Sequence, residues 1–259
     1  MSTLAYIILF SLLSGTLSLI GGMALLTQAG WVQRFSVHFV SYAAGVLLAA
    51  AFLDLLPEAF ELTVGEPEPL LLATLAGFIL LFLIERIFTR FHAHPAHGGH
   101  EAQHVHPHGG KTTPALLLVG DTIHNFIDGA VLAAAFLVSV PLGIVTALAV
   151  AAHELPQEIG DFSVMLSRGW DKAKVLWANV ASSLANLLGA LLVFTAQAVV
   201  EPLLPLLLAF TGGIFLYIAA SDLIPEVTSH TQTDKAWHVA VLLLLGIATV
   251  WGFGLFLHV

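Results

Sequence analysis

The sequence contains no cysteine and has very little charge: only 10% of its 259 residues are Asp, Glu, Lys or Arg. Without cysteine the chain has no disulfide framework, no thiolate nucleophile and no soft thiolate metal site. A metal bound by this chain must therefore take nitrogen and oxygen ligands. Apolar residues make up 58% of the chain and its mean hydropathy is +0.93, far above the range of soluble domains. These values indicate an integral membrane protein.

Runs of about 20 mostly apolar residues indicate helices that cross a bilayer. The sequence predicts eight such spans, so we expect an all-α, polytopic fold with residues 1–259 as a single transmembrane domain. The predicted spans are residues 3–27, 36–60, 68–90, 113–138, 141–167, 172–199, 203–228 and 236–258. The first span lacks a positively charged start and a small-residue cleavage site, so we expect a retained helix rather than a removed signal peptide.

The few positively charged residues all lie at or after the ends of odd-numbered predicted spans. They are Arg34, Arg86, Arg90, Lys111, Arg168, Lys172, Lys174 and Lys235. Lys and Arg collect on the cytoplasmic side of membrane proteins. We therefore expect both termini outside the cytoplasm.

Residues 43–60 resemble residues 211–228 at a constant offset of 168 residues, with seven of eighteen positions identical. The copies lie in the second and seventh spans, and this odd separation means that they cross the membrane in opposite directions. We therefore predict an inverted repeat of spans one to three and six to eight around a central hairpin of spans four and five, as is common in secondary transporters. The repeat shares Asp-Leu-x-Pro-Glu, and its acids, predicted as further ligands or pathway residues, are Asp54, Glu58, Asp222 and Glu226. The alternative is that the prolines end the helices and the acids face headgroups and water.

Two polar motifs interrupt the apolar run of spans four and five: His-Asn-Phe-Ile-Asp-Gly from His124 and His-Glu-Leu-Pro-Gln-Glu-Ile-Gly-Asp-Phe from His153. Residues four apart share a helix face, which pairs His124 with Asp128 and His153 with Gln157. A short link around residue 140 makes the two spans an antiparallel hairpin. At about 1.5 Å per residue, the two pairs lie at similar distances from the turn and should meet.

A charged residue at the centre of a membrane helix costs about 2.5–3.5 kcal/mol on the most lenient scale. Neither motif contains a Lys or Arg to compensate its acids, so a mobile cation, either a metal or protons, accounts best for the cluster. Histidine with carboxylate favours zinc, iron, manganese or a similar divalent ion over calcium or magnesium. We therefore interpret the polar residues of both motifs as ligands. Interhelical hydrogen bonding is the alternative, and it accounts better for single polar residues than for two motifs at one depth.

Further acids lie on the cytoplasmic side of this level. Asp121 and Asp161 are interpreted as a release route, with the alternative that they only face water. Glu158, four residues after Glu154, is a further ligand or pathway residue. Candidates in span six to complete a site are Asn179, Ser183 and Asn186.

Together, these motifs resemble those of the ZIP (Zrt-, Irt-like) divalent metal transporters. The first is similar to the family's His-Asn-x-x-Asp-Gly, and the second to the His-Glu-x-Pro-His-Glu-x-Gly-Asp-Phe form of one subfamily. The resemblance covers the whole chain and implies transport of zinc, or of iron, manganese, cobalt or cadmium, with no organic cofactor and no nucleic-acid partner. It also implies a homodimer, movement of one helix group against another and, for so compact a chain, a prokaryotic inner membrane.

The resemblance further implies a two-metal site. Its primary ligands would be His124, Asp128, His153 and Gln157, and its second set Asn125 and Glu154, with Asp128 as a bridge. Gln157 departs from the family pattern, because this subfamily has histidine there. A neutral glutamine is a weaker ligand, which bears on the strength of the primary site and on metal preference.

Residues 91–112 are predicted to form a disordered, cytoplasmic, metal-binding loop, since glycine and proline exclude a stable helix and histidine-rich tracts bind metals. Its histidines are His92, His94, His97, His100, His104, His106 and His108. The alternative is a solvated linker with no essential role in transport.

Three functions are compatible with the motifs. Uptake of zinc or a related metal into the cytoplasm is favoured. An intramembrane metallohydrolase is the second, because the motif from His153 is close to His-Glu-x-x-His, but Gln157 replaces the second histidine and Pro156 interrupts the motif. The third is a metal efflux exchanger that uses the same ligands.

Overall fold

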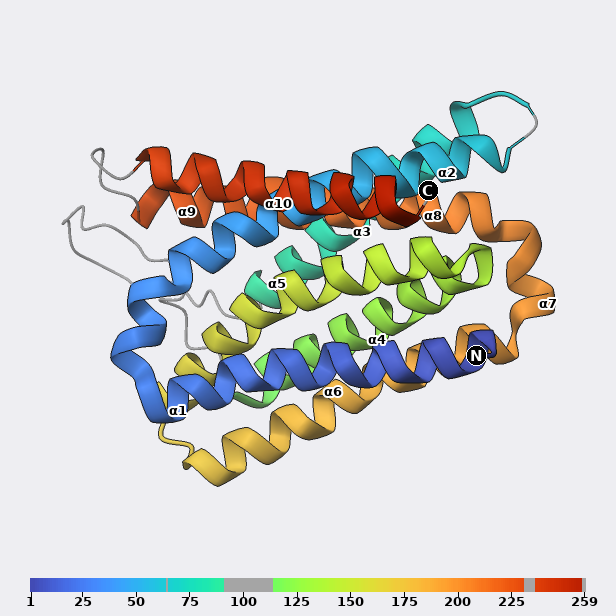
Figure 1. Ribbon diagram of the computed structural model, residues 1–259. Helices are drawn as coiled ribbons and strands as arrows, with labels where there is room; N and C mark the ends of the chain where they lie inside the picture. Colours follow the sequence, from blue (N-terminus) through green and yellow to red (C-terminus); the bar gives the residue numbers. More distant parts are fainter. Residues whose placement is uncertain (64, 91–113, 231–235, 258–259) are drawn as a thin grey trace.

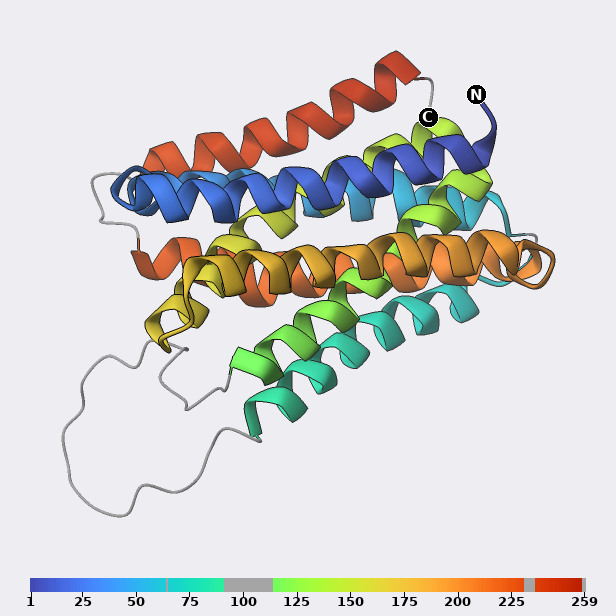
Figure 2. The same ribbon diagram turned by 90° about the horizontal axis from the view of Figure 1, so that it is seen from below.

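The computed structural model describes residues 1–63, 65–90, 114–230 and 236–257, and every regular element in these ranges is helical. The long helices run side by side in both views (Figure 1; Figure 2). The α-helices are α1 (Thr3–Ala49), α2 (Leu56–Glu61), α3 (Glu68–Arg90), α4 (Pro114–Val138), α5 (Val140–Ser167), α6 (Lys172–Thr195), α7 (Gln197–Val200), α8 (Leu204–Tyr217), α9 (Ile224–His230) and α10 (Ala236–Leu257). Two π-helices, η1 (Ala50–Leu55) and η3 (Ile218–Leu223), and the 3-10 helix η2 (Glu201–Leu203) complete the elements. The predicted loop of residues 91–112 lies outside the described residues.

Six helical segments of the described chain are long and apolar enough to cross a membrane. They are Thr3–Gln28, Val37–Glu61, Leu117–Val138, Lys172–Thr195, Gln197–Thr228 and Trp237–Phe256. A shorter apolar stretch, Glu68–Ile84, lies in α3. The 28-residue α5 runs among these helices but carries Glu154, Glu158 and Asp161. The prediction of an all-α membrane protein is confirmed, whereas the count of eight spans stays a prediction.

The first two predicted spans, 3–27 and 36–60, correspond to the segments Thr3–Gln28 and Val37–Glu61. The residues between them are also helical, so α1 consists of two helices joined at a kink, where Gln28 is the non-helical residue with φ −133° and ψ 42°. No proline occurs between residues 28 and 36 to end the helix. The Lys172 ammonium group, at the start of α6, donates to the Leu26 carbonyl at 2.7 Å beside this kink. Figure 1 shows α1 leaving the N-terminal end, bending near this point and returning to α2.

The prolines of the repeat do not end their helices. Pro57 and Pro225 are each the second residue of the α-helix that follows a π-helix, and the helical chain continues through them into α2 and α9. A proline lacks the donor for the regular helical bond and clashes with the carbonyl four residues earlier. The wider π-turn leaves room for the ring without breaking the helix. The two π-helices begin at Ala50 and Ile218, which differ by the same 168 residues as the sequence copies.

Glycines bring two pairs of helices into backbone contact. A Cβ atom added at Gly45 would lie 2.0 Å from a carbonyl oxygen of α10, and one at Gly246 would lie 2.3 Å from a carbonyl oxygen of α1. The same reciprocal arrangement joins α3 and α8 through Gly77 and Gly213, at 2.0 and 1.9 Å. Small residues permit such close approach of membrane helices. The second half of α1, α3, α8 and α10 thus form one helix group.

The remaining long helices form a second group. Gly129 of α4 and Gly189 of α6 approach each other's backbone in the same manner, at 1.7 and 2.0 Å for an added Cβ. The first half of α1 packs on α5, where Gly21 and Gly22 lie under the side chains of Leu155 and Phe162. One core cluster includes residues of both groups: the fully buried Ala44, Ala51, Ala149 and Ala219 lie in it with larger side chains such as Leu142 and Phe215.

Candidate metal site

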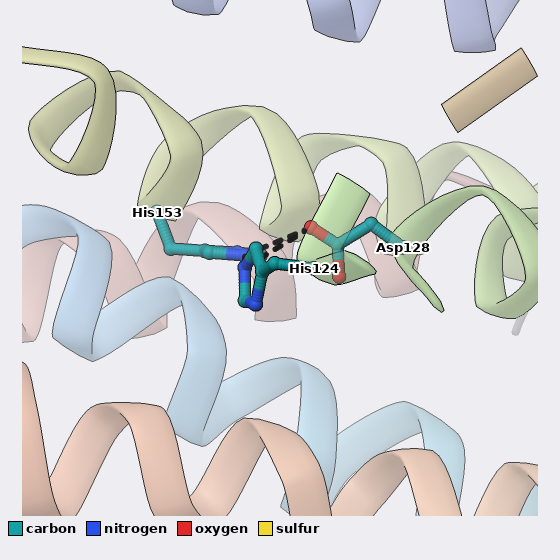
Figure 3. Close-up of side chains that lie close together, drawn as sticks. All are labelled: His124, Asp128 and His153. Atoms are coloured by element: carbon teal, nitrogen blue, oxygen red, sulfur yellow. Dashed lines mark hydrogen bonds and ion pairs between the residues drawn. The ribbon is translucent and has the colours of Figure 1, made fainter. Parts of the chain in front are cut away.

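Three side chains from α4 and α5 converge on one another (Figure 3). The Nε2 atoms of His124 and His153 are 3.2 Å apart. Asp128 Oδ2 lies 3.2 Å from Nε2 of His153 and 3.4 Å from Nε2 of His124. One ligand atom from each residue thus lies within 4.8 Å of the others. The prediction that the two motifs meet at one depth is confirmed for these three residues.

The contacts of the His153 ring fix its orientation, with its Nε2 atom toward the other two ligand residues. Its Nδ1 atom donates to the Ala149 carbonyl at 2.9 Å, so Nε2, which faces Asp128 and His124, is the ring atom available to a metal. The side chains of His153 and Asp128 are 1% exposed, and that of His124 is 15% exposed. The ring of Phe215, from α8 in the other helix group, packs on His153 with centroids 6.0 Å apart. Two imidazole nitrogens and a carboxylate form a ligand set suited to zinc and similar divalent ions.

The predicted second ligand set is buried beside this triad. The amide nitrogen of Asn125 donates to the backbone carbonyl and to the carboxylate of Asp121, at 3.1 and 3.0 Å. Glu154 accepts a hydrogen bond from Ser14 of α1 at 3.2 Å. Asn125 Oδ1 and Glu154 Oε1 are buried without a hydrogen-bond partner in the described chain. Gln157 lies one turn beyond His153 on α5 and is half-buried.

The sequence missed two hydroxyl partners of these acids. Ser182 of α6 donates to the Asp121 carboxylate and also accepts from Thr122 at 3.2 Å. Ser183, the predicted candidate, instead lies against Gly15 of α1 and is not part of this contact, which corrects the choice between the two serines. The spacing of three from Asn179 to Ser182 is as helical as the spacing of four to Ser183. Helical spacing therefore could not distinguish Ser182 from Ser183. No spacing pattern in the sequence pointed to Ser14 either.

The other predicted acids lie apart from the triad. Glu158 and Asp161 are buried on α5, 3% and 9% exposed. Asp54 is buried in η1, where its Oδ2 has no partner among the described residues. The remaining repeat acids lie nearer the surface and are Glu58, Asp222 and Glu226. The seven loop histidines lie outside the described residues.

Comparison with known proteins extends over nearly the whole chain. The family model described as ZIP Zinc transporter matches residues 2–116 and 96–257. Zinc transporter ZIP13 of Mus musculus is 32% identical over 258 residues, covering 86% of this chain and 70% of that protein. Zinc transporter ZIP4 of Homo sapiens is 30% identical over 291 residues, covering 89% of this chain and 45% of that protein. Zinc transporter ZIP13 of Danio rerio is 28% identical over 274 residues, covering 88% of this chain and 78% of that protein.

The named relatives are transporters and not enzymes, which agrees with the reading of both motifs as a binding site rather than as a hydrolase centre. The family match covers both motifs, and the triad assembled from them has the donor atoms that a zinc ion requires. The chain is a member of the ZIP zinc transporter family.

Proposed function

We propose that this protein transports zinc, or another divalent metal, into the cytoplasm through the site formed by His124, Asp128 and His153. The observation that carries the proposal is the convergence of three ligand atoms from α4 and α5 within 4.8 Å, two of them on fully buried side chains. The relatives are named zinc transporters, which favours a metal site over a cluster that only holds the helices together by hydrogen bonds. Iron, manganese, cobalt and cadmium are competing substrates of the same ligand chemistry.

A second metal ion is part of the proposal. Its ligands are Asn125 and Glu154, with Asp128 as a bridge, while Gln157 completes the primary set. The buried oxygens of Asn125 and Glu154 that have no partner in the described chain support this assignment. Buried polar oxygens without partners are costly in proteins, and a bound cation removes that cost.

The membrane topology is proposed to be an inverted repeat with eight spans. The two π-helices at the same offset of 168 residues support it, as do the reciprocal glycine contacts of α1 with α10 and of α8 with α3. Gly45 and Gly213 also differ by 168 residues. Figure 1 shows the second half of α1 and α8 running in opposite directions.

Alternating access is proposed to occur by movement of one helix group against the other. The glycine contacts hold helices within each group at backbone distance, whereas across the groups the Phe215 ring of α8 packs on His153 of α5. Small sliding movements of packed helices are one established form of such rearrangement. The homodimer and the prokaryotic inner membrane remain proposals; the compared relatives come from mammals and fish.

The function is tested by zinc flux into liposomes that contain a zinc-sensitive dye. We expect wild-type protein to fill the vesicles and His124→Ala and His153→Ala each to abolish the flux. Protease cutting of the loop at residues 91–112 establishes the orientation of the protein, and comparing both orientations distinguishes uptake from efflux. Zinc binding without passage in wild type, together with unchanged signals in both variants, would reject the transporter.

A further inference from the structure

The amide group of Asn125, on α4, is oriented by one neighbour. Its nitrogen donates to the backbone carbonyl of Asp121 at 3.1 Å and to Oδ1 of the same residue at 3.0 Å. An asparagine amide has two N–H donors and one oxygen, so these two acceptors use both donors. The reversed amide would place its oxygen against a carbonyl and a carboxylate, and these oxygens repel one another. The nitrogen of Asn125 therefore faces Asp121, and its oxygen points elsewhere.

The Asp121 side chain is held in turn from α6. Its Oδ2 atom accepts from the Ser182 hydroxyl group, while its Oδ1 atom accepts from Asn125, so each carboxylate oxygen has a donor. All three side chains belong to buried residues. A serine side chain is short, and it reaches α4 because the two helices are in backbone contact about two turns farther along, at Gly129 and Gly189. A row of hydrogen bonds thus connects α6 to Asn125 through Asp121.

The Oδ1 atom of Asn125 is the polar atom that this row leaves over. It is buried and has no hydrogen-bond partner in the described chain. Asp128 follows three residues later on the same side of α4, and its Oδ1 atom is likewise buried without a partner among the described residues. Buried polar atoms without partners are rare and costly. Two such oxygens one turn apart, one of them on a residue of the histidine site, indicate that both serve a bound cation.

We propose that Asp121 is a positioning residue for the second metal ion: held by Ser182, it fixes the Asn125 amide with its oxygen available to that ion. This role differs from the predicted release route, in which Asp121 itself would bind the passing ion. Hydrogen bonds from residues outside the ligand set orient metal ligands in this way. The inference rests on the proposed function, because Asn125 is a ligand only if the second ion binds.

The fixed orientation favours binding of the ion. An amide that rotates freely must be ordered when an ion arrives, and this ordering reduces affinity. Asn125 is ordered by Asp121 beforehand, so its oxygen needs no rotation. Without the Asp121 carboxylate, the same amide could turn either end toward the ion, and its N–H groups do not bind cations.

Two substitutions at residue 121 distinguish positioning from direct binding of the ion. Asp121→Asn removes the charge and keeps an oxygen that accepts from Asn125, whereas Asp121→Leu keeps a similar size and removes both oxygens. We expect zinc affinity in nanodiscs, measured by isothermal titration, to fall about tenfold or more in Asp121→Leu and less than about threefold in Asp121→Asn. The histidines of residues 91–112 are the same in every variant, so differences between variants report this site. Equal losses in the two variants would overturn the positioning role.

A double-mutant cycle tests whether Asp121 acts through Asn125. We expect Asn125→Ala to lower zinc affinity about tenfold, and the combination of Asp121→Leu with Asn125→Ala to bind zinc no more weakly than Asn125→Ala alone. A residue that acts through the Asn125 amide has nothing to orient once that amide is gone. Losses that add in the combined variant would show that Asp121 acts by another route. Unchanged zinc affinity in Asn125→Ala would reject Asn125 as a ligand and the positioning role with it.

The contribution of α6 is tested at Ser182. Ser182→Ala removes the donor to Asp121 and should lower zinc affinity about threefold or more. Ser11→Ala is the matched control and should leave it unchanged, because Ser11 is also 2% exposed and its hydroxyl group has no partner in the described part of the chain. Equal affinities of these two variants would contradict the role of α6. Absence of zinc flux in wild type with this pattern of affinities retained would reject the transport function and keep the positioning role.

Discussion

Asp128 is the residue on which the geometry of the histidine site depends most. It is the common partner of His124 and His153, and its second oxygen, Oδ1, is buried without a partner in the described chain. A carboxylate between two imidazoles supplies the negative charge that a divalent ion needs when it leaves water. The free Oδ1 makes the same residue available to a second ion.

The substitution Asp128→Asn removes this charge and keeps the shape of the side chain. We expect zinc affinity to fall about 10–100-fold, because an amide oxygen is a neutral and weaker ligand. Isothermal titration of zinc into the protein in detergent measures the change. Glu201→Gln is the control, since it makes the corresponding change at an exposed acid outside the predicted site. Equal zinc affinity of Asp128→Asn and wild type would exclude Asp128 as a ligand.

Gln157 tests how binding strength relates to flux. The substitution Gln157→His places an imidazole one turn from His153, where the resembling subfamily has histidine. We expect zinc affinity to rise about tenfold and the rate of zinc release to fall, because an added nitrogen ligand stabilises the bound ion more than the ion in transit. Competition binding and liposome flux measure the two effects. Gln197→His, on an exposed position of α7, is the control and should change neither zinc affinity nor flux. Unchanged zinc affinity in Gln157→His would exclude residue 157 from the primary site.

At the scale of helices, glycines allow pairs of helices to pack with their backbones in contact. The contact of Gly45 with α10 has its counterpart in that of Gly213 with α3, and no side chain fits at either position without moving a helix. Such contacts also favour Cα–H to carbonyl interactions between the helices. Gly45, Gly77, Gly213 and Gly246 thus allow backbone contact between the second half of α1 and α10 and between α3 and α8.

The substitutions Gly45→Ala and Gly213→Ala should each destabilise the protein by about 1–3 kcal/mol, because the new methyl group collides with a backbone carbonyl. Thermal unfolding in detergent measures the loss. Gly252→Ala in α10 is the matched control, since an added Cβ meets nothing within 4 Å there. Helix propensity predicts that the control gains stability slightly. Equal unfolding temperatures of Gly45→Ala and Gly252→Ala would contradict the close approach.

Helix positions and the histidine site could be predicted from sequence, because both depend on local periodicity. Spacing of four and a short link brought His124, Asp128 and His153 together without knowledge of the fold. The continuous α1 and the helices past Pro57 could not be predicted, since a kink at Gln28 and a π-turn both depend on tertiary packing. Ser14 and Ser182 were missed for the same reason: a lone serine in an apolar helix has no periodic signal, and its partner lies on another helix.

For the whole molecule, the positions of the Lys and Arg residues indicate how the helix bundle is oriented in the membrane. Figure 1 shows the N-terminus and the end of α10 on the side opposite to the α5–α6 link. The residues around that link include Arg168, Lys172 and Lys174, and the end of α3 carries Arg86 and Arg90. Positive charge favours the cytoplasmic side. The histidine site thus lies between an end of the bundle almost free of positive charge and a basic end, which we expect to face the cytoplasm.

This orientation predicts which single cysteines a membrane-impermeant maleimide reaches in intact cells. The chain has no native cysteine, so each introduced thiol reports alone. Glu66→Cys, exposed in the link between α2 and α3, should react from outside, whereas Ser167→Cys, exposed at the end of α5, should react only after the membrane is opened. Total thiol labelling in detergent controls for accessibility. The reverse pattern would place the termini in the cytoplasm. Reaction of both thiols from the same side would mean that an even number of spans, rather than an odd number, separates residues 66 and 167.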